Sequence, residues 1–458
     1  MKTYAVLLAA GKGTRMKTEL PKCAYQLLKK PMIEYCVERL ENSQVDDIVV
    51  VVGHKKEIIQ DILKERVQYA IQSEQLGTGH AALCAATILE KEKGKIIILP
   101  GDMPLFDSRL IDKILNAHDE MGNDLTLVTA VFDNPKGYGR IVKDKYGAVC
   151  SIVEELDCTD FQKQIKEINT GVYVINSEDL FSSLKKININ ERKGEFYLTD
   201  IVSIMKKTHK IGVFPVRNNI LTMGINDLYQ ISIAEKYLRD EINKIHMLNG
   251  VSIINPETVT IGHDVIIEPG AIINPNTTIT GKSTIKAGSI IGPNTEIHES
   301  KINENSQVKH SLVYDSIVGK NTTVGPFAHL RGHAEIGENN RIGNFVEVKG
   351  SKTGEGTKAA HLSYIGDSIV GDRVNFGCGS ITVNYDGVNK HKTIIGNDVF
   401  IGCNVNMIAP LNISDNVFIA AGSTVTEDVP KGSLTIARSK QINKEDYAKN
   451  LVKPKIKE

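Results

Sequence analysis

The chain has 458 residues, with 55 Lys and Arg balanced by 55 Asp and Glu, seven Cys and no Trp. That length exceeds what a single hydrophobic core organises, so at least two domains are expected. The balanced charge excludes a global basic field for binding nucleic acid or a membrane surface, and no apolar run approaches membrane-spanning length.

Residues 1–225 alternate apolar strands with helix-like stretches, which indicates an α/β domain. The predicted strands are Tyr4–Ala9, Asp47–Val52, Lys95–Leu99 and Leu125–Phe132, and the predicted helices are Met32–Glu41, Lys55–Arg66 and Gly79–Glu90. The apolar run Ala5–Ala10 is short and passes into Gly11-Lys12-Gly13, so a signal peptide is not expected.

A helix is predicted across the next segment, 226–250, which links the two halves of the chain. Asn226-Asp227 is typical of an N-cap, and Asn249-Gly250 is typical of a helix end. Between them apolar residues follow helical spacing, at Leu228, Ile231, Ala234, Leu238, Ile242 and Ile245.

Beyond residue 250 an aliphatic residue returns at every sixth position. The registers are Ile261, Ile267, Ile273, Ile279, Ile285, Ile291 and Ile297; after a slip, Val318, Val324, Leu330, Ile336, Ile342 and Val348; and then Ile395, Ile401, Met407, Ile413, Ile419 and Val425. A period of six contains the strand period of two and does not fit a helix. Each hexad is expected to form a short strand with an inward aliphatic residue and a corner, which predicts a parallel β-helix over roughly 251–430. A lysine-rich tail follows.

The first strand leads into a glycine-rich turn, Leu8-Ala9-Ala10-Gly11-Lys12-Gly13-Thr14-Arg15-Met16. Such a turn directs backbone N–H groups toward phosphate, although alone it is equally well a plain tight turn. It is neither a Walker A loop nor a dinucleotide fingerprint. Gly101-Asp102 follows another predicted strand, at the sheet edge where α/β proteins bind ligands. Asp102 is therefore placed to hold Mg²⁺ against phosphate oxygens.

Seven motifs over this domain resemble the sugar-1-phosphate nucleotidylyltransferases: LAAGKGTRM, LPK, QLGTGHA, GDMPL, GYGRIV, VEE and EINTGV. With the hexads, nearly the whole chain is similar to the bifunctional family that acetylates glucosamine 1-phosphate and then uridylylates N-acetylglucosamine 1-phosphate. The resemblance implies a Rossmann-like uridylyltransferase domain with a mixed sheet (1–225), a linker helix (226–250) and a left-handed β-helix acetyltransferase domain with its tail (251–458). It further implies a cytoplasmic homotrimer that uses Mg²⁺, UTP and acetyl-CoA, with small-molecule substrates and neither nucleic-acid nor membrane partners. Its product would be UDP-N-acetylglucosamine, a precursor of peptidoglycan and lipopolysaccharide.

The resemblance also assigns the residues of the first site, one by one. It implies that Leu8, Ala9, Ala10 and Gly11 line the uridine and its phosphates, and that Lys12, Arg15 and Lys22 meet the triphosphate. It implies that Gln72, Gly77 and Thr78 bind the uracil, and that Gly139, Glu154 and Asn169 hold the sugar. Asp102 and Asn226 would share the Mg²⁺. Pro100 departs from the family, which usually has a small polar or thiol residue before Gly-Asp.

The hexad register is expected to fail twice, at 351–357 and at the polar stretch 383–392, where insertions would leave the wall and carry binding residues. Strand alternation places Val346 and Val348 inside, with Glu347 and Lys349 outside. The motif Ala360-His361-Leu362-Ser363-Tyr364-Ile365-Gly366 resembles the acetyltransferase half of the family.

That resemblance assigns the second site. It implies that Arg331, Lys349, Tyr364, Asn375 and Lys390 bind glucosamine 1-phosphate. It implies that Cys378, Cys403, Ala421 and Arg438 lie along acetyl-CoA, with Asn384 and Tyr385 beside the reacting groups. His361 would be the general base, since a free imidazole titrates at roughly pH 6.5 and can take the amine proton. Glu347 orienting that imidazole is a hypothesis. Cys378 and Cys403 depart from the alanine and serine common in the family, which predicts sensitivity to thiol-alkylating reagents and protection by acetyl-CoA.

Three functions remain to be separated. The first is the two-reaction enzyme. The second is a nucleotidylyltransferase alone, with the β-helix as a regulatory or oligomerising appendage. The third is a non-enzymatic β-helix scaffold or ice-binding surface, which would show flat ranks of threonine, whereas this wall carries mixed Lys, Glu, Asn and His. The motifs AHLSYIGD and NYDGVNK favour the first, because an appendage needs neither. The cysteines contain no CxxC pair, which favours free thiols over disulfides or structural zinc.

Overall fold

The computed structural model describes the chain except for residues 1, 12, 14–15, 17–18, 191–193 and 452–458. The chain divides into two compact units, Met1–Leu238 and Arg239–Glu458. The boundary falls inside helix α9 (Leu228–Leu248), which occupies most of the segment predicted as a linker helix. Among the described residues no helix has the length and apolar character needed to span a bilayer.

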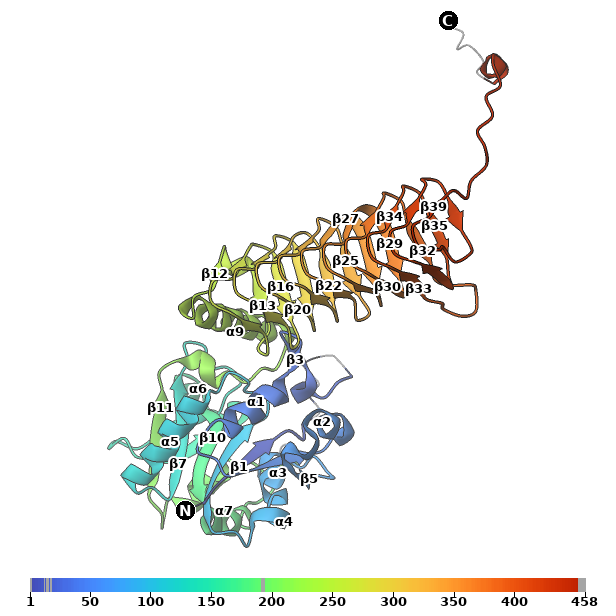
Figure 1. The fold of residues 1–458 in the computed structure, drawn as a ribbon. Helices are drawn as coiled ribbons and strands as arrows, with labels where there is room; N and C mark the ends of the chain where they lie inside the picture. The colour runs from blue at the N-terminus through green and yellow to red at the C-terminus, as the bar shows by residue number, and fades with distance from the viewer. Residues whose placement is uncertain (1, 12, 14–15, 17–18, 191–193, 452–458) are drawn as a thin grey trace, which may run out of the picture. The chain divides into compact units, whose positions relative to one another are not determined.

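The first unit is built on one mixed sheet in the order β11-β7-β10-β6-β1-β4-β5, with the β8–β9 hairpin attached to β10 (Figure 1). β1 runs parallel to both β4 and β6, while β10 runs antiparallel to β6 and β7. The predicted strands are confirmed to within two residues. The strands are β1 (Lys2–Leu8), β4 (Asp47–Val52), β5 (Gln68–Ile71), β6 (Gly94–Pro100), β7 (Leu125–Val131), β8 (Arg140–Lys143), β9 (Val149–Val153), β10 (Glu167–Asn176) and β11 (Ile211–Val216).

Helices cover both faces of this sheet, because its central strands are apolar on both sides. Tyr4 and Val6 of β1 pack in one core with α3, α4, α7 and α8, whereas Ala5 and Leu7 pack in a second core with α1, α2 and α5. The predicted helix 55–66 is shorter than expected, with a 3-10 turn at its end, and the predicted helix 79–90 is divided in two. The helices are α1 (Met32–Glu41), α2 (Lys56–Leu63), α3 (Thr78–Cys84), α4 (Ala86–Leu89), α5 (Ser108–Met121), α6 (Asp160–Lys163), α7 (Ser177–Leu184) and α8 (Asp200–Met205).

The first half of α9 belongs to a small third core of this unit. Ile231, Ala234 and Leu238 are buried there against Met16, the hairpin of β2 (Gln26–Leu27) and β3 (Lys30–Pro31), and α1. The predicted stripe is therefore confirmed in its middle, but its ends, Leu228 and Ile245, are exposed. This core ties the start of α9, and with it Asn226, to the rest of the first unit.

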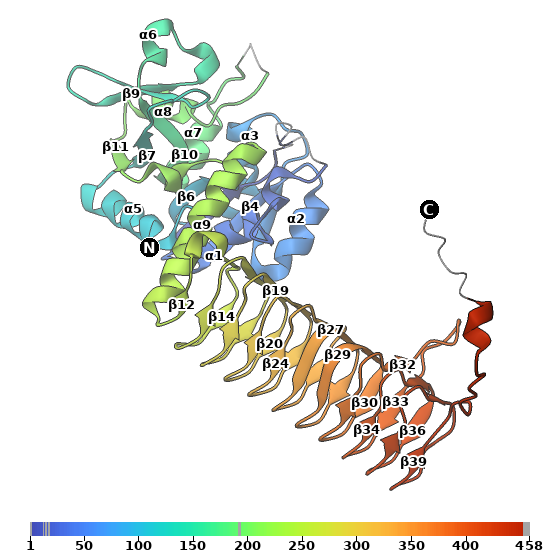
Figure 2. The same cartoon turned by 90° about the horizontal axis from the view of Figure 1, so that it is seen from above.

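The second unit is a parallel β-helix, in which short strands stack coil upon coil (Figures 1 and 2). Each coil contributes to three ladders of inward side chains, here called walls A, B and C. Wall A begins at Ile253 and Ile273, wall B at Ile261 and Ile279, and wall C at Ile267 and Ile285. Every hexad residue predicted to point inward is buried. The strands run from β12 (Ser252–Ile253) to β39 (Leu434–Thr435).

The coils differ in length. Ile261 pairs with Ile279, 18 residues later, but Ile297 pairs with Val313, only 16 residues later. The slip in the sequence register is thus a shortening of the corners, and the walls remain continuous. The predicted interruption at 351–357 is also wrong, because the walls continue through this segment. β28 (Lys352–Thr353) and β29 (Lys358–Gly366) stay in the walls, and the buried Thr353 and Ala359 replace the expected aliphatic residues.

The second predicted excursion is confirmed. Val370 pairs with Ile395, 25 residues later, so one coil carries an insertion between walls B and C. It leaves the wall after β32 (Ile381–Val383) and is closed by an antiparallel bridge between Tyr385 and Lys390. Asp386 stabilises its turn by accepting hydrogen bonds from the backbone N–H groups of Val388 and Asn389.

Candidate active sites

In the first unit, Lys22 brings together the two residues assigned to a metal. Asp102 follows the carboxyl end of β6, where Gly101 N donates to Leu8 O over 2.9 Å. Asn226 is held nearby because Ile225 N donates to Asp102 O, also over 2.9 Å. Lys22 Nζ donates to Asn226 Oδ1 over 2.7 Å and forms an ion pair with Asp102. The Lys22 and Asp102 side chains are only 15% and 18% exposed, so the ion pair is shielded from bulk water.

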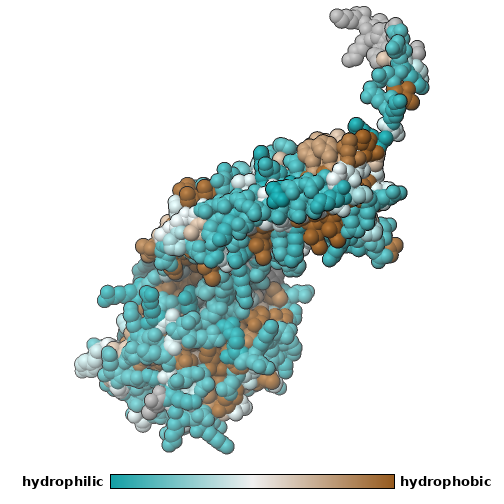
Figure 3. Space-filling view, in the orientation of Figure 1, coloured by the Kyte–Doolittle hydropathy of each residue, from teal (hydrophilic) through white to brown (hydrophobic). Residues whose placement is uncertain are grey.

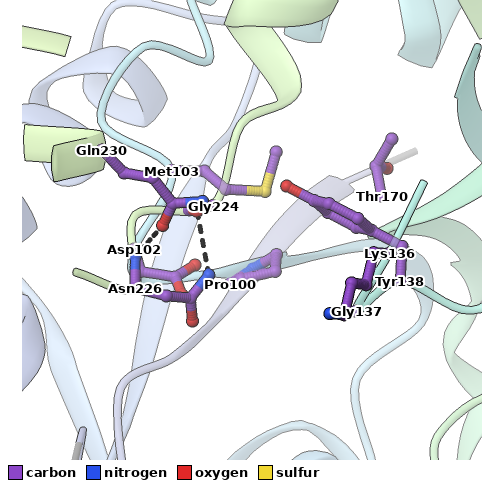
Figure 4. A pocket seen from close by; sticks show the side chains of 10 residues that line it. All are labelled: Pro100, Asp102, Met103, Lys136, Gly137, Tyr138, Thr170, Gly224, Asn226 and Gln230. Carbon is purple, nitrogen blue, oxygen red and sulfur yellow. Dashed lines mark hydrogen bonds between the residues drawn. The ribbon is translucent and has the colours of Figure 1, made fainter. Parts of the chain in front are cut away.

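A cavity of about 230 Å³ opens beside this cluster (Figure 4). Asp102, Asn226 and Gln230 line one part of it, and Tyr138 and Thr170 line another. Asn226 is fixed at the cavity wall, since its Nδ2 donates to Gly224 O over 3.0 Å and its N to Gln230 Oε1 over 2.6 Å. The cavity is therefore open to a ligand that meets a carboxylate and amide groups at one end.

Pro100, the departure from the family pattern, is the last residue of β6, so its missing N–H falls at the end of the strand. Its ring also lines the cavity and faces Gly171, where an added Cβ would lie 3.0 Å from Pro100 Cγ. Gly171 has φ +83°, a conformation that favours glycine. The proline thus leaves Asp102 in place and packs closely against the neighbouring strand.

The three residues assigned to the sugar lie together. Asn169 N donates to Gly139 O over 2.8 Å, and a Cβ added to Gly139 would lie 3.5 Å from Glu154 Oε1. Asn169 Nδ2 donates to Tyr173 Oη over 2.6 Å. Burial, and secondarily the charge of Glu154, raise the pKa of Tyr173, so its hydroxyl stays protonated. Together these residues form a hydrogen-bonding surface that carries one charged group, the carboxylate of Glu154.

The residues assigned to the uracil also lie together, around the start of α3. Gln72 Nε2 donates to Gly77 O over 3.1 Å and is 3.1 Å from His80 Nδ1. Gly77 has φ +98°, and a Cβ there would lie 2.6 Å from Phe196 O, so glycine is required. Thr78 is less available than expected, because its hydroxyl accepts a hydrogen bond from Leu198 N.

Leu8, Ala9, Ala10 and Gly11 continue from the carboxyl end of β1 toward the same edge of the sheet. An added Cβ at Gly11 would meet nothing within 4 Å, so this backbone faces open space. At Gly13 an added Cβ would lie 2.5 Å from Lys22 Cβ, which packs the turn against the lysine. Lys12 and Arg15 lie outside the described residues.

In the β-helix, five exposed residues form one column along the corner between walls A and B. His361 is in register with Asn344 on the preceding coil. On the following coils Gly379 N donates to Leu362 O, Asn404 N to Cys378 O, and Gly422 N to Cys403 O, each over 2.8 Å. The guanidinium of Arg438 donates to Ala421 O over 2.9 Å. The column is therefore His361, Cys378, Cys403, Ala421 and Arg438, all exposed.

A cationic cluster lies at the other edge of wall B, on the corner toward wall C. Lys390 interacts with Lys349, whose hydrogen bonding and like charge lower the pKa of Lys390. Lys349 Nζ also lies 3.5 Å from Asp367 Oδ2, which accepts a hydrogen bond from Asn384 over 2.5 Å. The ring of Tyr364 reaches this cluster, with its hydroxyl 3.4 Å from Asn384 Nδ2. Two ammonium groups held together suit a phosphate dianion.

The other residues assigned to the second site do not lie beside the residues that they were expected to accompany. Glu347 is outside, as predicted, but its carboxylate binds Arg331, at 2.7 Å from Nε and 2.6 Å from Nη2. The residue beside His361 in the sheet is Asn344, so the hypothesis that Glu347 orients this imidazole within the chain is wrong. Asn375 lies on wall A between Lys358 and Phe400, away from Tyr364, and Tyr385 donates to Gly387 O in the inserted loop.

His361 and the cationic cluster do not meet within one chain. Lys349 is in register with Gly366, at the end of wall B. His361 lies on the corner between walls A and B, before the chain enters wall B. Five residue steps separate the two positions along the chain, and the backbone turns between them at Leu362, which has φ +38°. One chain therefore presents the two halves of the assigned acetyl-transfer site on two different corners.

Sequence reasoning missed several lining residues. Lys136, Thr170 and Gln230 line the cavity beside Asp102, and Asp367 joins the lysine cluster. Asp367 has a sequence signal, since it follows Gly366 directly after the AHLSYIG motif. Gln230 carries none, because it reaches Asn226 only through the first turn of α9. Within the described residues there is no group of three or more His, Cys, Asp or Glu side chains that could hold a metal.

Comparison with known proteins covers the whole chain. Family models match residues 5–198 to the MobA-like NTP transferase domain and residues 257–339 to the GMPPB C-terminal domain. A bifunctional protein GlmU of Acholeplasma laidlawii is 62% identical over 457 residues, covering 100% of this chain and 99% of that protein. Those of Streptococcus mutans and an Exiguobacterium species are 46% and 45% identical over 98% of this chain, and over 98% and 100% of their own lengths.

Proposed function

The chain belongs to the family of bifunctional GlmU proteins, and from that premise we propose that each of its two units carries one of two transferase sites. The chain is a nucleotidyltransferase and an acetyltransferase of UDP-N-acetylglucosamine synthesis. Residues 1–225 would act on UTP and N-acetylglucosamine 1-phosphate. Residues 251–458 would act on acetyl-CoA and glucosamine 1-phosphate, with 226–250 as the linker.

The observation that carries the first assignment is the contact of Lys22 with both Asp102 and Asn226, two residues that line the cavity. Asp102 and Asn226 offer oxygen ligands, which Mg²⁺ prefers, and they already share one cation, the Lys22 ammonium. The residues therefore fit a magnesium ion. When bound, it would neutralise phosphate charge as the sugar phosphate oxygen attacks the α-phosphorus of UTP and pyrophosphate leaves.

The residues of this unit would contribute positioning and charge. Lys22 would turn from Asp102 to the triphosphate, while Gly139, Glu154 and Asn169 hold the sugar against it. The attacking phosphate is already anionic, so no general base is needed. Gln72 and Gly77 offer hydrogen-bonding groups without charge, which suits the edge of a uracil.

The exposed column supports a path for acetyl-CoA along the β-helix. Adjacent coils are about 4.8 Å apart, so four steps from His361 to Arg438 span roughly 19 Å. Arg438 would meet the phosphates of the coenzyme, and His361 would lie at the thioester end. There His361 would remove a proton from the sugar amine as it attacks the thioester carbonyl, and the coenzyme thiolate would leave.

The separation of His361 from the lysine cluster supports a homotrimer in which a neighbouring chain completes each site. An exposed ridge next to His361 offers a surface for that contact. Phe327 stacks on Phe345 with ring centroids 5.3 Å apart, His310 lies 5.8 Å from Phe327, and Leu362 follows in register. Phe327, Phe345 and Leu362 are each more than half exposed, and such ridges mark interfaces.

The substrates also support a cytoplasmic location, since UTP and acetyl-CoA are made there and all seven cysteines are free. The test is incubation of the full chain with glucosamine 1-phosphate, acetyl-CoA, UTP and Mg²⁺, omitting each in turn. UDP-N-acetylglucosamine should require all four. With N-acetylglucosamine 1-phosphate, acetyl-CoA should become dispensable. Product formed from N-acetylglucosamine 1-phosphate but never from glucosamine 1-phosphate would reject the acetyltransferase and leave the β-helix as an appendage.

A further inference from the structure

Two of the seven cysteines stand out because they are exposed and stacked. Cys378 and Cys403 are exposed, whereas Cys23, Cys36 and Cys158 are buried, and Cys84 and Cys150 are partly covered. Burial is the main cause that raises the pKa of Cys23, to about 12, and the pKa of Cys36, Cys84 and Cys158. Cys378 and Cys403 are the two thiols that a bulky reagent can reach, because they are exposed.

The wall fixes the distance between these two residues. Phe376 pairs with Ile401 in a parallel register, so Cys378 and Cys403 occupy the same place on consecutive coils. Asn404 N donates to Cys378 O over 2.8 Å, and a Cβ added to Gly377 would lie 2.5 Å from Cys403 N. Neighbouring parallel strands are about 4.8 Å apart. That spacing is inside the range of about 4.4–6.8 Å between Cα atoms that a disulfide spans.

The pair also lies where a coenzyme thiol would be found. Cys378 follows His361 by one coil in the column, and Cys403 is followed by Ala421. If the column binds coenzyme A, its disulfide would bring a reactive S–S bond to the same corner.

We propose that Cys378 and Cys403 form an accessible dithiol that coenzyme A disulfide oxidises to an intramolecular disulfide, which closes the acetyltransferase site. The proposal rests on the proposed acetyl-CoA column. The Cys378 thiolate attacks one sulfur of the coenzyme disulfide, which forms a mixed disulfide and releases one coenzyme A thiolate. The Cys403 thiolate then attacks the Cys378 sulfur and releases the second. The dithiol loses two electrons, the coenzyme disulfide gains them, and the two protons pass to the two released thiols.

The effect should be confined to one activity. A bridge across the column places its two sulfurs where the pantetheine arm would lie and draws adjacent coils together at the corner. Acetyl transfer should fall at least about tenfold and recover with dithiothreitol, since the exchange is reversible. Uridylyl transfer should be unchanged, because Lys22, Asp102 and Asn226 belong to the other unit.

The experiment uses the full chain incubated with coenzyme A disulfide under native conditions. Intact mass should fall by two hydrogens, and proteolysis should yield a peptide pair linking Cys378 to Cys403. Cys378→Ala and Cys403→Ser should each retain a mixed disulfide with coenzyme A and never form the bridge. Cys150→Ser is the matched control and should form the bridge like the unmodified chain. Each variant is compared with its own untreated sample.

The outcomes separate this proposal from the proposed function. Two stable coenzyme adducts on Cys378 and Cys403, or unmodified thiols, would overturn the dithiol even if acetyl transfer is normal. A bridge that leaves acetyl transfer unchanged would overturn the closure of the site. Absence of acetyl transfer in untreated protein would reject the proposed function. The disulfide could still be detected in that case, because its measurement by intact mass does not depend on activity. Phenylarsine oxide, which needs two neighbouring thiols, should bind once to the unmodified chain and to neither single variant.

Discussion

The two units place their functional residues in opposite ways. In the first unit, loops from distant parts of the chain meet at one edge of a sheet, so Lys22, Asp102 and Asn226 touch although more than 200 residues separate the outer two. In the β-helix each residue is carried forward coil by coil, so His361 and Lys349 keep to their own corners. A sheet edge gathers residues within one chain, whereas a solenoid sorts them into columns.

The consequence is that a solenoid needs something besides its own wall to build a compact site. The insertion at 383–392 supplies part of this, because Asn384 and Lys390 reach the lysine cluster from it.

Apolar surface also remains toward the C-terminal end of the β-helix, near β39 (Figure 3). Phe400 stacks on Phe418 there, and both are exposed together with Leu434, the next residue in register.

The largest expected effect breaks the first unit alone. Asp102→Ala removes the carboxylate that faces Lys22 and, by proposal, Mg²⁺, so uridylyl transfer should fall by about a thousandfold or more. Acetyl transfer by the same preparation should be within twofold of the parent, about the scatter expected for an untouched site. Retention of most uridylyl transfer would contradict the role of Asp102.

The next effect breaks the second unit alone. His361→Ala should lower acetyl transfer by about a hundred- to a thousandfold, because the amine loses its proton acceptor. Uridylyl transfer measured with N-acetylglucosamine 1-phosphate should persist. Loss of both activities together would indicate misfolding, which circular dichroism of the β-helix would detect, and full acetyl transfer would exclude His361 as the base.

A smaller effect tests the lysine pair. Lys390→Ala removes one of two adjacent ammonium groups, so KM for glucosamine 1-phosphate should rise by about tenfold, the value of one charge-assisted hydrogen bond. Lys392→Ala, an exposed lysine at the end of the same insertion, is the matched control and should leave KM unchanged. Equal effects of the two substitutions would mean that only the general charge of the loop matters.

The smallest effect on chemistry comes from the wall itself. Ile291→Ala empties a fully buried position of the β-helix, several coils before His361, and should lower the stability of this unit by about 2–5 kcal/mol. Denaturant unfolding should show a lower midpoint for the β-helix transition, while both activities stay near those of the parent at 25 °C. An unchanged midpoint would show that the ladder tolerates a missing side chain.

Much of the fold could be predicted because periodicity is local. Hexads such as Ile279, Ile285 and Ile291 repeat a strand and a corner, and every one is buried as expected. The prediction is wrong at 351–357, where small or polar residues replace the aliphatic ones without changing the fold. Thr353 and Ala359 fill inward positions there, so the wall is continuous and no insertion is present. Five-residue steps such as Ile297 to Ile302 shorten a corner, and sequence alone does not distinguish this from a break.

The family resemblance proposes the site as a set of residues, but it does not give their geometry. The pairing of Lys22 with both Asp102 and Asn226 depends on the entry into α9, which no local motif specifies. Glu347 was expected near His361 from its outward direction alone, yet the register sets it beside Tyr364 and its carboxylate binds Arg331. Strand alternation predicts whether a side chain points inward or outward, whereas the length of each coil decides which residues lie side by side on adjacent coils.

The most direct test asks whether the acetyl-transfer site is divided between chains. His361→Ala and Lys390→Ala chains, each with a different tag, are co-expressed and purified through both tags. Acetyl transfer is compared with each variant alone at a glucosamine 1-phosphate concentration well below KM, where the raised KM of Lys390→Ala lowers its rate about tenfold. If His361 of one chain works with Lys390 of its neighbour, mixed trimers should regain about a third of the parent activity, since purification through both tags keeps only trimers that hold both variants, and each of these has both residues intact at one interface of three. Activity no higher than the average of the two separate variants would contradict the divided site and require both residues to act within one chain.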